Sequence, residues 1–386
     1  MTVHSTLSAR IRSRLVLESL DATHDHVSRA LRDEGVVLSE DALTALVIDL
    51  EREFNGAGIL QPLLETPGVT DVLVNGVESV WWDRGDGLEQ AEVQFASEAE
   101  VRRYAQRLAA SARRRLDDAS PMLDAQLPDG TRMHCVLAPI SLSGTTISLR
   151  IPSQSTFTVN SLMLAGSIDE QVGEVLLEIV HSRLAFLISG GTGTGKTTVL
   201  SALLAHVDPS HRIVVVEDSA ELNPKHPHVV RLQSRLPNIE GAGAITMRDL
   251  VRTSLRMRPN RIVVGEVRGA EVVDLLSALN TGHEGGCGTV HANRPDDVPA
   301  RLEALGLTAG LDRTALHALM GAGLDAVIHL HRTNTGLRVV QGIHVMHRDS
   351  SGIVVTEPAI TWNGRVWDRA SGWSALRRRL EASAGC

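Results

Sequence analysis

The sequence predicts an α/β protein whose main domain has a mostly parallel central sheet, preceded by a smaller mixed α/β domain and a helical N-terminal segment. The first observation is a series of Val/Ile/Leu-rich runs that alternate with helical patterns after residue 167. The second is a set of short strands with a hairpin between residues 57 and 151. The third is size and composition, because 386 residues with 43% hydrophobic and 22% charged side chains suit two or three globular domains.

Residues 1–56 are expected to form a helical segment. Leu43, Val47 and Leu50 recur at helical spacing behind Ser39, a residue type that caps helix N-termini. No pattern of side chains here indicates a catalytic or binding role, so the segment is interpreted as a structural appendage.

Residues 57–151 are expected to form a mixed α/β domain, because the apolar spacing changes after Gly68 from helical to strand-like. Ser97 and Glu100 have the spacing of a capping box, which predicts a helix that continues to about Ala112. Strands are predicted at 69–74, 80–83 and 88–95, around 129–130, and at 145–151.

A Ser-, Thr- and Pro-rich stretch at 152–166 predicts a linker to the main domain, 167–355, and residues 356–386 are interpreted as a C-terminal extension. Ser167 and Glu170 have capping spacing, which predicts the first helix of the main domain. Further elements are predicted there as strands at 184–189, 212–218, 261–266 and 288–291, and helices at 196–206, 246–257 and 270–281.

Composition argues against several classes of protein. The 38 basic and 46 acidic residues give a net charge of −8, which disfavours non-specific nucleic-acid binding by the whole chain. Three widely spaced cysteines cannot build a disulfide framework or a four-cysteine zinc site. No apolar run approaches the roughly 18 residues that span a bilayer, and no secretory signal is found, so a cytoplasmic location without a transmembrane segment is expected.

The strongest motif is a phosphate loop. Residues 190–197 match the pattern G-x-x-x-x-G-K-[ST] directly after a predicted strand and at the start of a predicted helix. Glycines let backbone N–H groups converge on phosphates at the positive end of a helix dipole. Lys196 suits the β- and γ-phosphates, and the Thr197 hydroxyl suits Mg²⁺. The predicted ATP-binding residues are Gly190, Gly191, Thr192, Gly193, Thr194, Gly195, Lys196, Thr197 and Thr198.

Carboxylates that end two predicted core strands are candidates for the hydrolytic chemistry. Glu266 ends the strand 261–266, where a carboxylate can hold Mg²⁺ or orient water, although the aspartate usual at such a position is missing. Glu217 and Glu221 follow another core strand and are further candidates. The sequence leaves open which of these acids activates water.

His283 and His291 flank a glycine-rich run beside another predicted strand end. Two histidines close to a phosphate site indicate a sensing or positioning role, whereas a lone histidine is more often an interior hydrogen-bond donor. No third metal ligand occurs at useful spacing, so a zinc site is not expected.

These motifs resemble those of the secretion-superfamily hexameric ATPases, which drive type II secretion, type IV pili and type IV secretion. Glu217-Asp218-x-x-Glu221 resembles their acidic box, Gly265-Glu266 their aspartate-free second motif, and the segment 281–293 their histidine box. The type II secretion branch usually has a four-cysteine insertion, which this chain lacks. Longer strings resemble the tight-adherence (Tad) pilus-assembly ATPases and their conjugal-transfer relatives; they lie at 119–124, 127–132, 237–241, 246–251 and 255–261.

The resemblance implies a RecA-like ATPase domain, an N-terminal domain, and a hexameric ring that binds ATP and Mg²⁺ between the two domains. It also implies that Arg132 and Arg150 of the N-terminal domain reach the phosphates, where a guanidinium binds oxygen atoms bidentately. ATP-driven closure of the domains would then power pilus assembly or protein secretion at the inner face of the cytoplasmic membrane, through integral membrane platform proteins.

Three other functions stay open at this point. A conjugative type IV secretion ATPase differs in cargo rather than in chemistry. A RecA-like nucleic-acid translocase is disfavoured because aromatic residues are only 3% of the chain, which leaves few side chains for base stacking. A regulatory nucleotide binder without turnover is favoured only if the carboxylates lie far from the phosphates.

Overall fold

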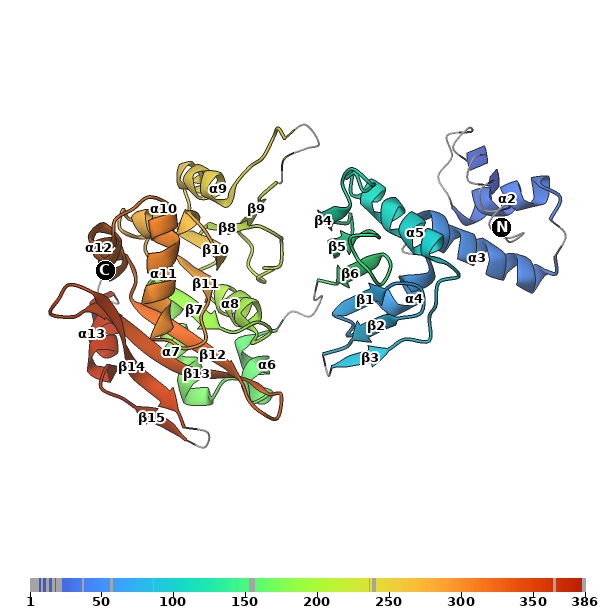
Figure 1. Ribbon diagram of the computed structural model, residues 1–386. Coiled ribbons are helices and arrows are strands. Elements are labelled where there is room, and N and C mark those ends of the chain that lie inside the picture. Colours follow the sequence, from blue (N-terminus) through green and yellow to red (C-terminus); the bar gives the residue numbers. More distant parts are fainter. Residues whose placement is uncertain are drawn as a thin grey trace. The chain divides into compact units, whose positions relative to one another are not determined.

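The structure is a computed structural model, which describes residues 7, 10–11, 14–15, 18, 23–36, 38–55, 58–85, 87–152, 157–235, 237, 241–363 and 366–383. Its contacts divide the chain into two compact units, Met1–Ser153 and Gln154–Cys386, each with its own helices and sheet (Figure 1). Most of the predicted helical residues before 23, the linker residues 153–156 and residues 238–240 lie outside the described residues.

The first unit begins with a small helical cluster. α2 spans His24–Asp33 and α3 spans Glu40–Asn55, so α3 covers the residues whose apolar spacing predicted a helix. The Ser39 hydroxyl accepts a hydrogen bond from the Ala42 amide at 3.4 Å, which satisfies one free donor at the start of α3. The two helices share a buried apolar cluster that includes Val27, Ala30, Leu31, Val47 and Leu50.

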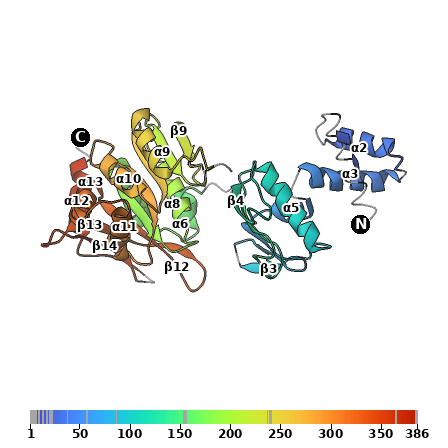
Figure 2. The ribbon, with the colours of Figure 1, turned by 45° about the horizontal axis from the view of Figure 1, so that its top comes forward.

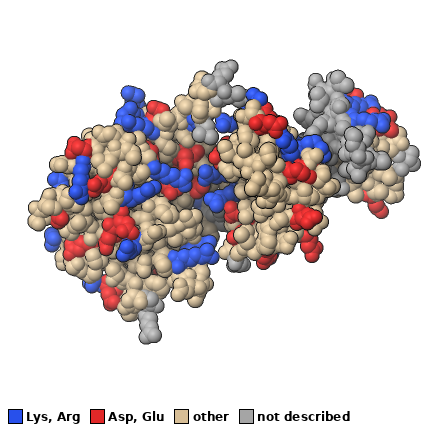
Figure 3. Space-filling model, viewed as in Figure 1, with Lys and Arg blue, Asp and Glu red and all other residues tan. Residues whose placement is uncertain are grey.

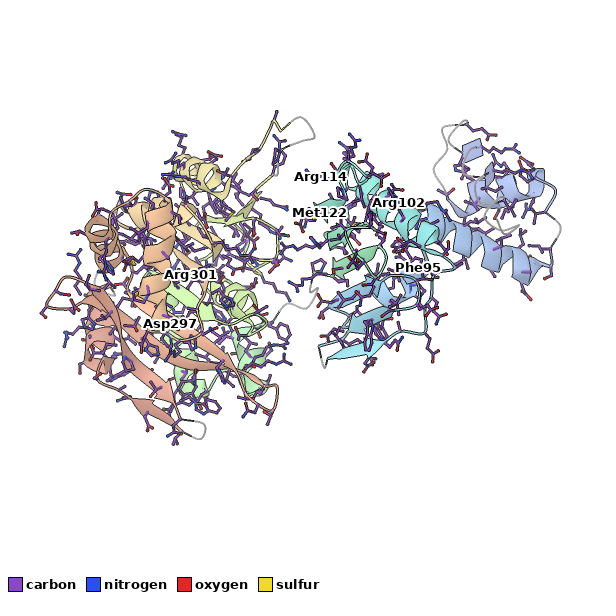
Figure 4. All side chains as sticks on the ribbon, in the orientation of Figure 1. Phe95, Arg102, Arg114, Met122, Asp297 and Arg301 are labelled. Carbon is purple, nitrogen blue, oxygen red and sulfur yellow. The ribbon has the colours of Figure 1, made fainter. Side chains whose placement is uncertain are left out.

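The rest of the first unit is a six-stranded antiparallel sheet in the order β3-β2-β1-β6-β5-β4, with the helix α5 (Glu98–Ser111) packed on it. Phe95, labelled in Figure 4, packs edge-on against Tyr104 of α5 with ring centroids 5.4 Å apart. Two short helices, η1 (Gly58–Leu60) and α4 (Gln61–Leu64), precede the sheet. Its strands are β1 (Asp71–Asn75), β2 (Val80–Asp83), β3 (Leu88–Gln90), β4 (Met122–Gln126), β5 (Arg132–Val136) and β6 (Thr146–Arg150).

One predicted strand of this unit is wrong. Asp129 and Gly130 form the turn between β4 and β5, because the Asp129 carboxylate accepts a hydrogen bond from the Thr131 amide at 2.9 Å and Gly130 has a φ of +91°. A positive φ and a local side-chain-to-backbone bond are typical of a tight connection rather than of a strand. The predicted strand 88–95 is also shorter, since β3 ends at Gln90.

The second unit is built on a nine-stranded sheet in the order β15-β14-β13-β12-β7-β11-β10-β8-β9. The strands from β12 to β9 pair in parallel, and β13, β14 and β15 extend the sheet with antiparallel pairs. Central strands such as β7 and β8 are buried throughout, which explains their continuous apolar runs. The strands are β7 (Phe186–Gly190), β8 (Ile213–Glu217), β9 (Val229–Gln233), β10 (Arg261–Val267), β11 (Cys287–His291), β12 (Ala326–Arg332), β13 (Arg338–Arg348), β14 (Val354–Trp362) and β15 (Trp367–Arg369).

Helices cover both faces of this sheet, as Figures 1 and 2 show. One apolar core includes Leu176, Leu200 and Leu376 from three helices, and a second core contains Leu250 and Leu302. None of the helices that the structure describes is both long and apolar enough to cross a bilayer. The helices are α6 (Val159–Leu164), α7 (Glu170–His181), α8 (Lys196–Leu204), α9 (Met247–Ser254), η2 (Leu255–Met257), α10 (Glu271–Leu279), α11 (Asp297–Thr308), α12 (Arg313–Gly323) and α13 (Trp373–Ser383).

Two boundaries differ from those predicted. Part of the predicted linker forms α6, because Thr158 and Ser161 cap this helix reciprocally and Val159 and Leu162 are buried in the core of the second unit. Residues 356–386, predicted as an extension, contribute most of β14, all of β15 and α13 to the same unit. Burial of apolar side chains, which a Ser- and Thr-rich composition does not reveal, causes the first difference.

Candidate functional site

The phosphate loop connects β7 to α8, so it lies at the carboxyl edge of the parallel strands. Gly190, Gly193 and Gly195 have φ values of +153°, +71° and +92°, a backbone region that favours glycine. A Cβ atom at Gly190 would lie 2.7 Å from the carbonyl oxygen of Leu330 on the neighbouring strand β12. Both backbone conformation and close approach therefore require glycine in this motif.

The Lys196 ammonium folds back over the loop that precedes it. Its Nζ donates hydrogen bonds to the carbonyl oxygens of Gly190 at 3.0 Å and Gly191 at 2.8 Å. Burial lowers the pKa of Lys196, the negative charge of Glu266 opposes this effect, and the positive charge of Arg268 adds to it. A phosphate group at the loop would compensate the charge of this partly buried ammonium.

The loop also offers hydrogen-bond donors to an anion. Within the described ranges, the amide N–H groups of Thr192 and Gly193 donate to no protein acceptor. The positive end of the α8 dipole faces the same place. Thr197 and Thr198 lie in the first turn of α8 and are only half-buried, so the Thr197 hydroxyl is available to a metal ion. This donor set fits the phosphates of a nucleotide.

A magnesium ion at this edge would have few protein ligands. Among the described residues, no group of three or more His, Cys, Asp or Glu side chains is arranged to hold a metal. Mg²⁺ commonly uses one or two protein oxygens and completes its shell with water and phosphate oxygens. Thr197 and Glu266 are the residues that fit this mode of binding.

Glu266 lies near the carboxyl end of β10 and forms an ion pair with Arg268. The other arm of the Arg268 guanidinium, Nη1, lies 2.8 Å from Asp218 Oδ2. Glu266 raises and Arg268 lowers the pKa of Lys196, so this ion-pair network lies within electrostatic reach of the phosphate loop. The Glu266 side chain is 22% exposed, which leaves its carboxylate accessible to water or to a metal ion.

Glu271 fixes the backbone that carries Arg268, a function that the sequence analysis did not predict. Its buried carboxylate accepts hydrogen bonds from the backbone N–H groups of Arg268 and Gly269, both at 2.7 Å. Glu271 therefore acts on the site through Arg268. A glutamate at the start of a helix is common enough that spacing alone gave no signal for this contact.

Glu217 is the last residue of β8, and its side chain is buried. Its Oε1 accepts hydrogen bonds from the amides of Glu221 at 3.1 Å and Leu222 at 2.9 Å. Burial raises the pKa of Glu217 to about 7, and the two backbone hydrogen bonds oppose that rise only in part. Glycine is required at Gly265, where a Cβ atom would lie 2.5 Å from Glu217 Cγ. Glu217 thus shapes the turn that leads to the exposed Glu221.

The two predicted histidines lie at opposite edges of the sheet. His291 ends β11, is exposed, and pairs in register with Gly190, so it lies beside the phosphate loop. His283 precedes β11 at the other edge, where the Phe186 amide at the start of β7 donates to the Gly286 carbonyl at 3.3 Å. The expectation that both histidines adjoin the phosphate site is therefore wrong for His283, because the five-residue strand β11 separates them.

Arg132 and Arg150 lie in the first unit, directly opposite each other on β5 and β6. Arg150 is exposed, and its Nε donates to Asp71 Oδ1 on the neighbouring strand β1 at 3.1 Å. The two guanidinium groups thus belong to one end of the first unit's sheet. Their contact with the phosphates stays a prediction.

Arg338 contacts the phosphate loop, although no motif singled it out in the sequence. It is the first residue of β13, and its Nε donates a hydrogen bond to the Gly193 carbonyl at 2.8 Å. His329, buried on β12, lies beside the same loop, with Nδ1 2.8 Å from Ser189 Oγ. Both residues lie at the loop because β12 pairs with β7, the strand that leads into the loop. Only this strand pairing, and no motif, could have indicated them.

A family model described as "Type II/IV secretion system protein" matches residues 53–352 of the chain. The match covers more than half of the sequence and includes the phosphate loop, Glu217 and Glu266. The chain therefore belongs to the type II/IV secretion system protein family.

Individual relatives agree with this assignment. A putative conjugal transfer protein of Mycobacterium tuberculosis (strain CDC 1551 / Oshkosh) is 50% identical over 355 residues, which cover 90% of this chain and 100% of the relative. The conjugal transfer protein TrbB of Rhizobium radiobacter is 29% identical over 286 residues, 73% of this chain and 85% of the relative.

Two solved structures share the fold. The pilus retraction motor PilT with bound ADP is 18% identical, with a TM-score of 0.53 over 85% of this chain and 88% of its own. The Legionella pneumophila ATPase DotB is 15% identical, with a TM-score of 0.52 over 84% of this chain and 85% of its own. Identities this low support a common fold and no more.

Proposed function

We propose that this chain is a magnesium-dependent ATP hydrolase with a RecA-like ATPase domain that powers a secretion or pilus-assembly machine. The observation that carries the proposal is the phosphate loop. Its glycine turns and Lys196 stand at the carboxyl edge of a parallel sheet, at the head of a buried helix. That arrangement suits a chain of phosphates bound by backbone amides and one ammonium group.

Hydrolysis, rather than binding alone, is supported by the carboxylates at the same edge. Glu266 is accessible and close enough to Lys196 to raise the pKa of its ammonium, so we assign to Glu266 the roles of holding Mg²⁺ with Thr197 and of orienting the attacking water. Glu217 and Glu221 are the alternatives for activating water. His291 is proposed to sense or position the γ-phosphate from the adjacent strand.

The family suggests how such a unit would do work. We propose a homo-hexameric ring in which Arg132 and Arg150 bind the phosphates when ATP draws the two units together. Hydrolysis would let the two units separate again. The ring would then push cargo through integral membrane platform proteins at the inner face of the cytoplasmic membrane. The names of the relatives, a pilus motor and conjugal transfer proteins, support a machine of this kind.

Two branches of the family differ in cargo. Strings such as 119–124 and 255–261 resemble Tad pilus-assembly ATPases. The relative that is 50% identical over its whole length is named a putative conjugal transfer protein, so conjugative type IV secretion is the second candidate. A nucleic-acid translocase has less support, because acidic and basic side chains are interspersed on the face of the second unit that Figure 3 draws, and the net charge is −8.

The decisive experiment compares the chain's two lysines. Lys196→Ala removes the ammonium at the phosphate loop, and we expect the affinity for Mg-ATP to fall by about 10- to 100-fold and ATPase turnover to fall to background. Lys225→Ala removes an exposed ammonium and should leave both quantities unchanged. Turnover close to wild type in the Lys196→Ala protein would overturn the proposed function.

A further inference from the structure

The hairpin formed by β12 and β13 lies beside the phosphate loop. β12 pairs in parallel with β7, the strand that leads into the loop, with His329 opposite Ser189. The fit is tight, because the Leu330 carbonyl oxygen occupies the position that a Cβ atom at Gly190 would need. This hairpin belongs to the same unit as the loop, so its contacts with the loop do not depend on the first unit.

Arg338 extends from this hairpin onto the phosphate loop at two points. Its Nε donates to the carbonyl oxygen of Gly193 at 2.8 Å, and its Cδ lies 3.6 Å from where a Cβ atom at Gly195 would be. The Gly193 carbonyl oxygen thus accepts its hydrogen bond from a side chain of the hairpin. The Gly193 amide donates to no acceptor among the described residues and stays available to an anion.

Most donors of the Arg338 guanidinium are unused. An arginine has five N–H donors in a planar fork, and Nε alone is bonded among the contacts of the described residues. No described carboxylate lies within ion-pair distance of this exposed side chain, whereas Arg268 nearby is paired with Glu266 and Asp218. A cation with free Nη groups beside a phosphate loop is suited to a bidentate contact with phosphate oxygens.

We infer that Arg338 binds the phosphates of the nucleotide held by its own chain, with Nε on Gly193 and the Nη groups toward the phosphate oxygens. This inference rests on the proposed function, since it concerns the same nucleotide. It adds a cation from the second unit to the two arginines expected from the first, so the phosphates would be partly neutralised before the units close. Nucleotide affinity in the separate second unit would then depend on Arg338.

The test uses three substitutions at Arg338 and one control. Arg338→Ala removes both the charge and the bond to Gly193. Arg338→Gln keeps a donor for Gly193 but loses the charge, and Arg338→Lys keeps the charge without the fork. Arg332→Ala is the control, because Arg332 lies opposite Arg338 on the same hairpin but its Nε donates to the Gly336 carbonyl of the hairpin turn at 3.4 Å instead of to the phosphate loop.

Titration with fluorescent ADP and ATP in the presence of Mg²⁺ should give a Kd about tenfold higher for Arg338→Ala and Arg338→Gln, a smaller rise for Arg338→Lys, and no change for Arg332→Ala. Melting temperatures without nucleotide should agree within about 2 °C, and if Arg338→Ala does not fold, the Gln and Lys variants decide. Wild-type affinity in Arg338→Gln would overturn the inference and leave Arg338 as a support for the loop. A wild-type protein that binds no nucleotide would instead overturn the proposed function, and this inference with it.

Discussion

Glu266 is held at the site by a chain of three side chains. Its carboxylate pairs with Arg268, Arg268 is also bonded to Asp218, and Glu271 fixes the Arg268 backbone. Each contact restricts the next, so the carboxylate of Glu266 has a defined position before any nucleotide arrives. Such preorganisation favours catalysis, because the protein does not have to reorganise during the reaction.

We expect Glu266→Gln to keep Mg-ATP binding within about threefold while turnover falls by roughly 10² to 10⁴, the usual contribution of a positioned acid or base. The amide keeps the size of the side chain but cannot accept a proton from water. Steady-state hydrolysis and nucleotide titration measure the two quantities. Glu284→Gln, an exposed glutamate beside His283 at the other edge of the sheet, is the control. Unchanged turnover in Glu266→Gln would remove this residue from the mechanism.

Glu217 should make stability depend on pH. Burial raises its pKa from the usual 4.5 to about 7, so the folded protein binds this proton more tightly than the unfolded chain does. The stabilisation from protonated Glu217 is complete below about pH 4.5 and is lost as the pH rises through about 7. The loss is at most roughly 3 kcal/mol, at 1.36 kcal/mol per pKa unit.

Glu217→Gln stays neutral throughout this range and should not show this loss. The free energy of unfolding of the variant, relative to wild type, should therefore increase between pH 5 and pH 8. Urea titrations at several pH values measure the difference. A difference that does not change with pH would show that Glu217 is ionised in the fold across the whole range.

At the scale of elements, α6 shows how a short helix gains stability from packing. It has only six residues, yet a reciprocal cap by Thr158 and Ser161 and the burial of Val159 and Leu162 fix it to α7 and α8. Leu164 at its end is 91% exposed, so the two leucines of this helix have opposite environments.

Leu162→Ala should lower the free energy of unfolding of the second unit by about 2–5 kcal/mol, the usual cost of a buried Leu-to-Ala change. Leu164→Ala, on the same helix, should change it by less than about 0.5 kcal/mol. Chemical denaturation of both variants checks this pair of values. Equal effects would mean that α6 does not belong to the core of the second unit.

An element could be predicted from the sequence where its own residues carry the pattern that defines it. The strands β7, β8, β10 and β11 were predicted because burial on both faces imposes continuous apolar runs. The phosphate loop was predicted because its glycines are required by the backbone. By contrast, β12 to β15 carry no motif, and Arg338 reaches the loop only through the pairing of β12 with β7. His283 was misplaced because sequence proximity to a strand does not show which end of it a residue occupies.

At the scale of the whole molecule, the chain divides its proposed phosphate-binding cations between two units. Lys196 and Arg338 lie in the second unit, and Arg132 and Arg150 lie on adjacent strands of the first. If the proposed function is correct, binding needs the second unit and rapid turnover needs both.

The double variant Arg132→Ala with Arg150→Ala should lower turnover by about 10-fold or more, since each guanidinium would stabilise charge that develops on the phosphates. Nucleotide binding and the melting temperature should change little. A double variant of Arg102 and Arg115 to Ala is the control, because these arginines pair with Asp118 and Asp117 inside the first unit. Turnover assays with mass photometry of the assembly separate loss of chemistry from loss of the ring. Equal rates in both double variants would exclude Arg132 and Arg150 from the proposed mechanism.

The scarcity of lysine has a practical consequence. Two side chains in the whole sequence carry a primary amine, and one of them, Lys196, is partly buried at the phosphate loop. Acylating reagents therefore find few targets besides the phosphate loop and the exposed Lys225. Acylation of Lys196, located by peptide mapping, therefore reports directly whether a ligand covers the phosphate loop.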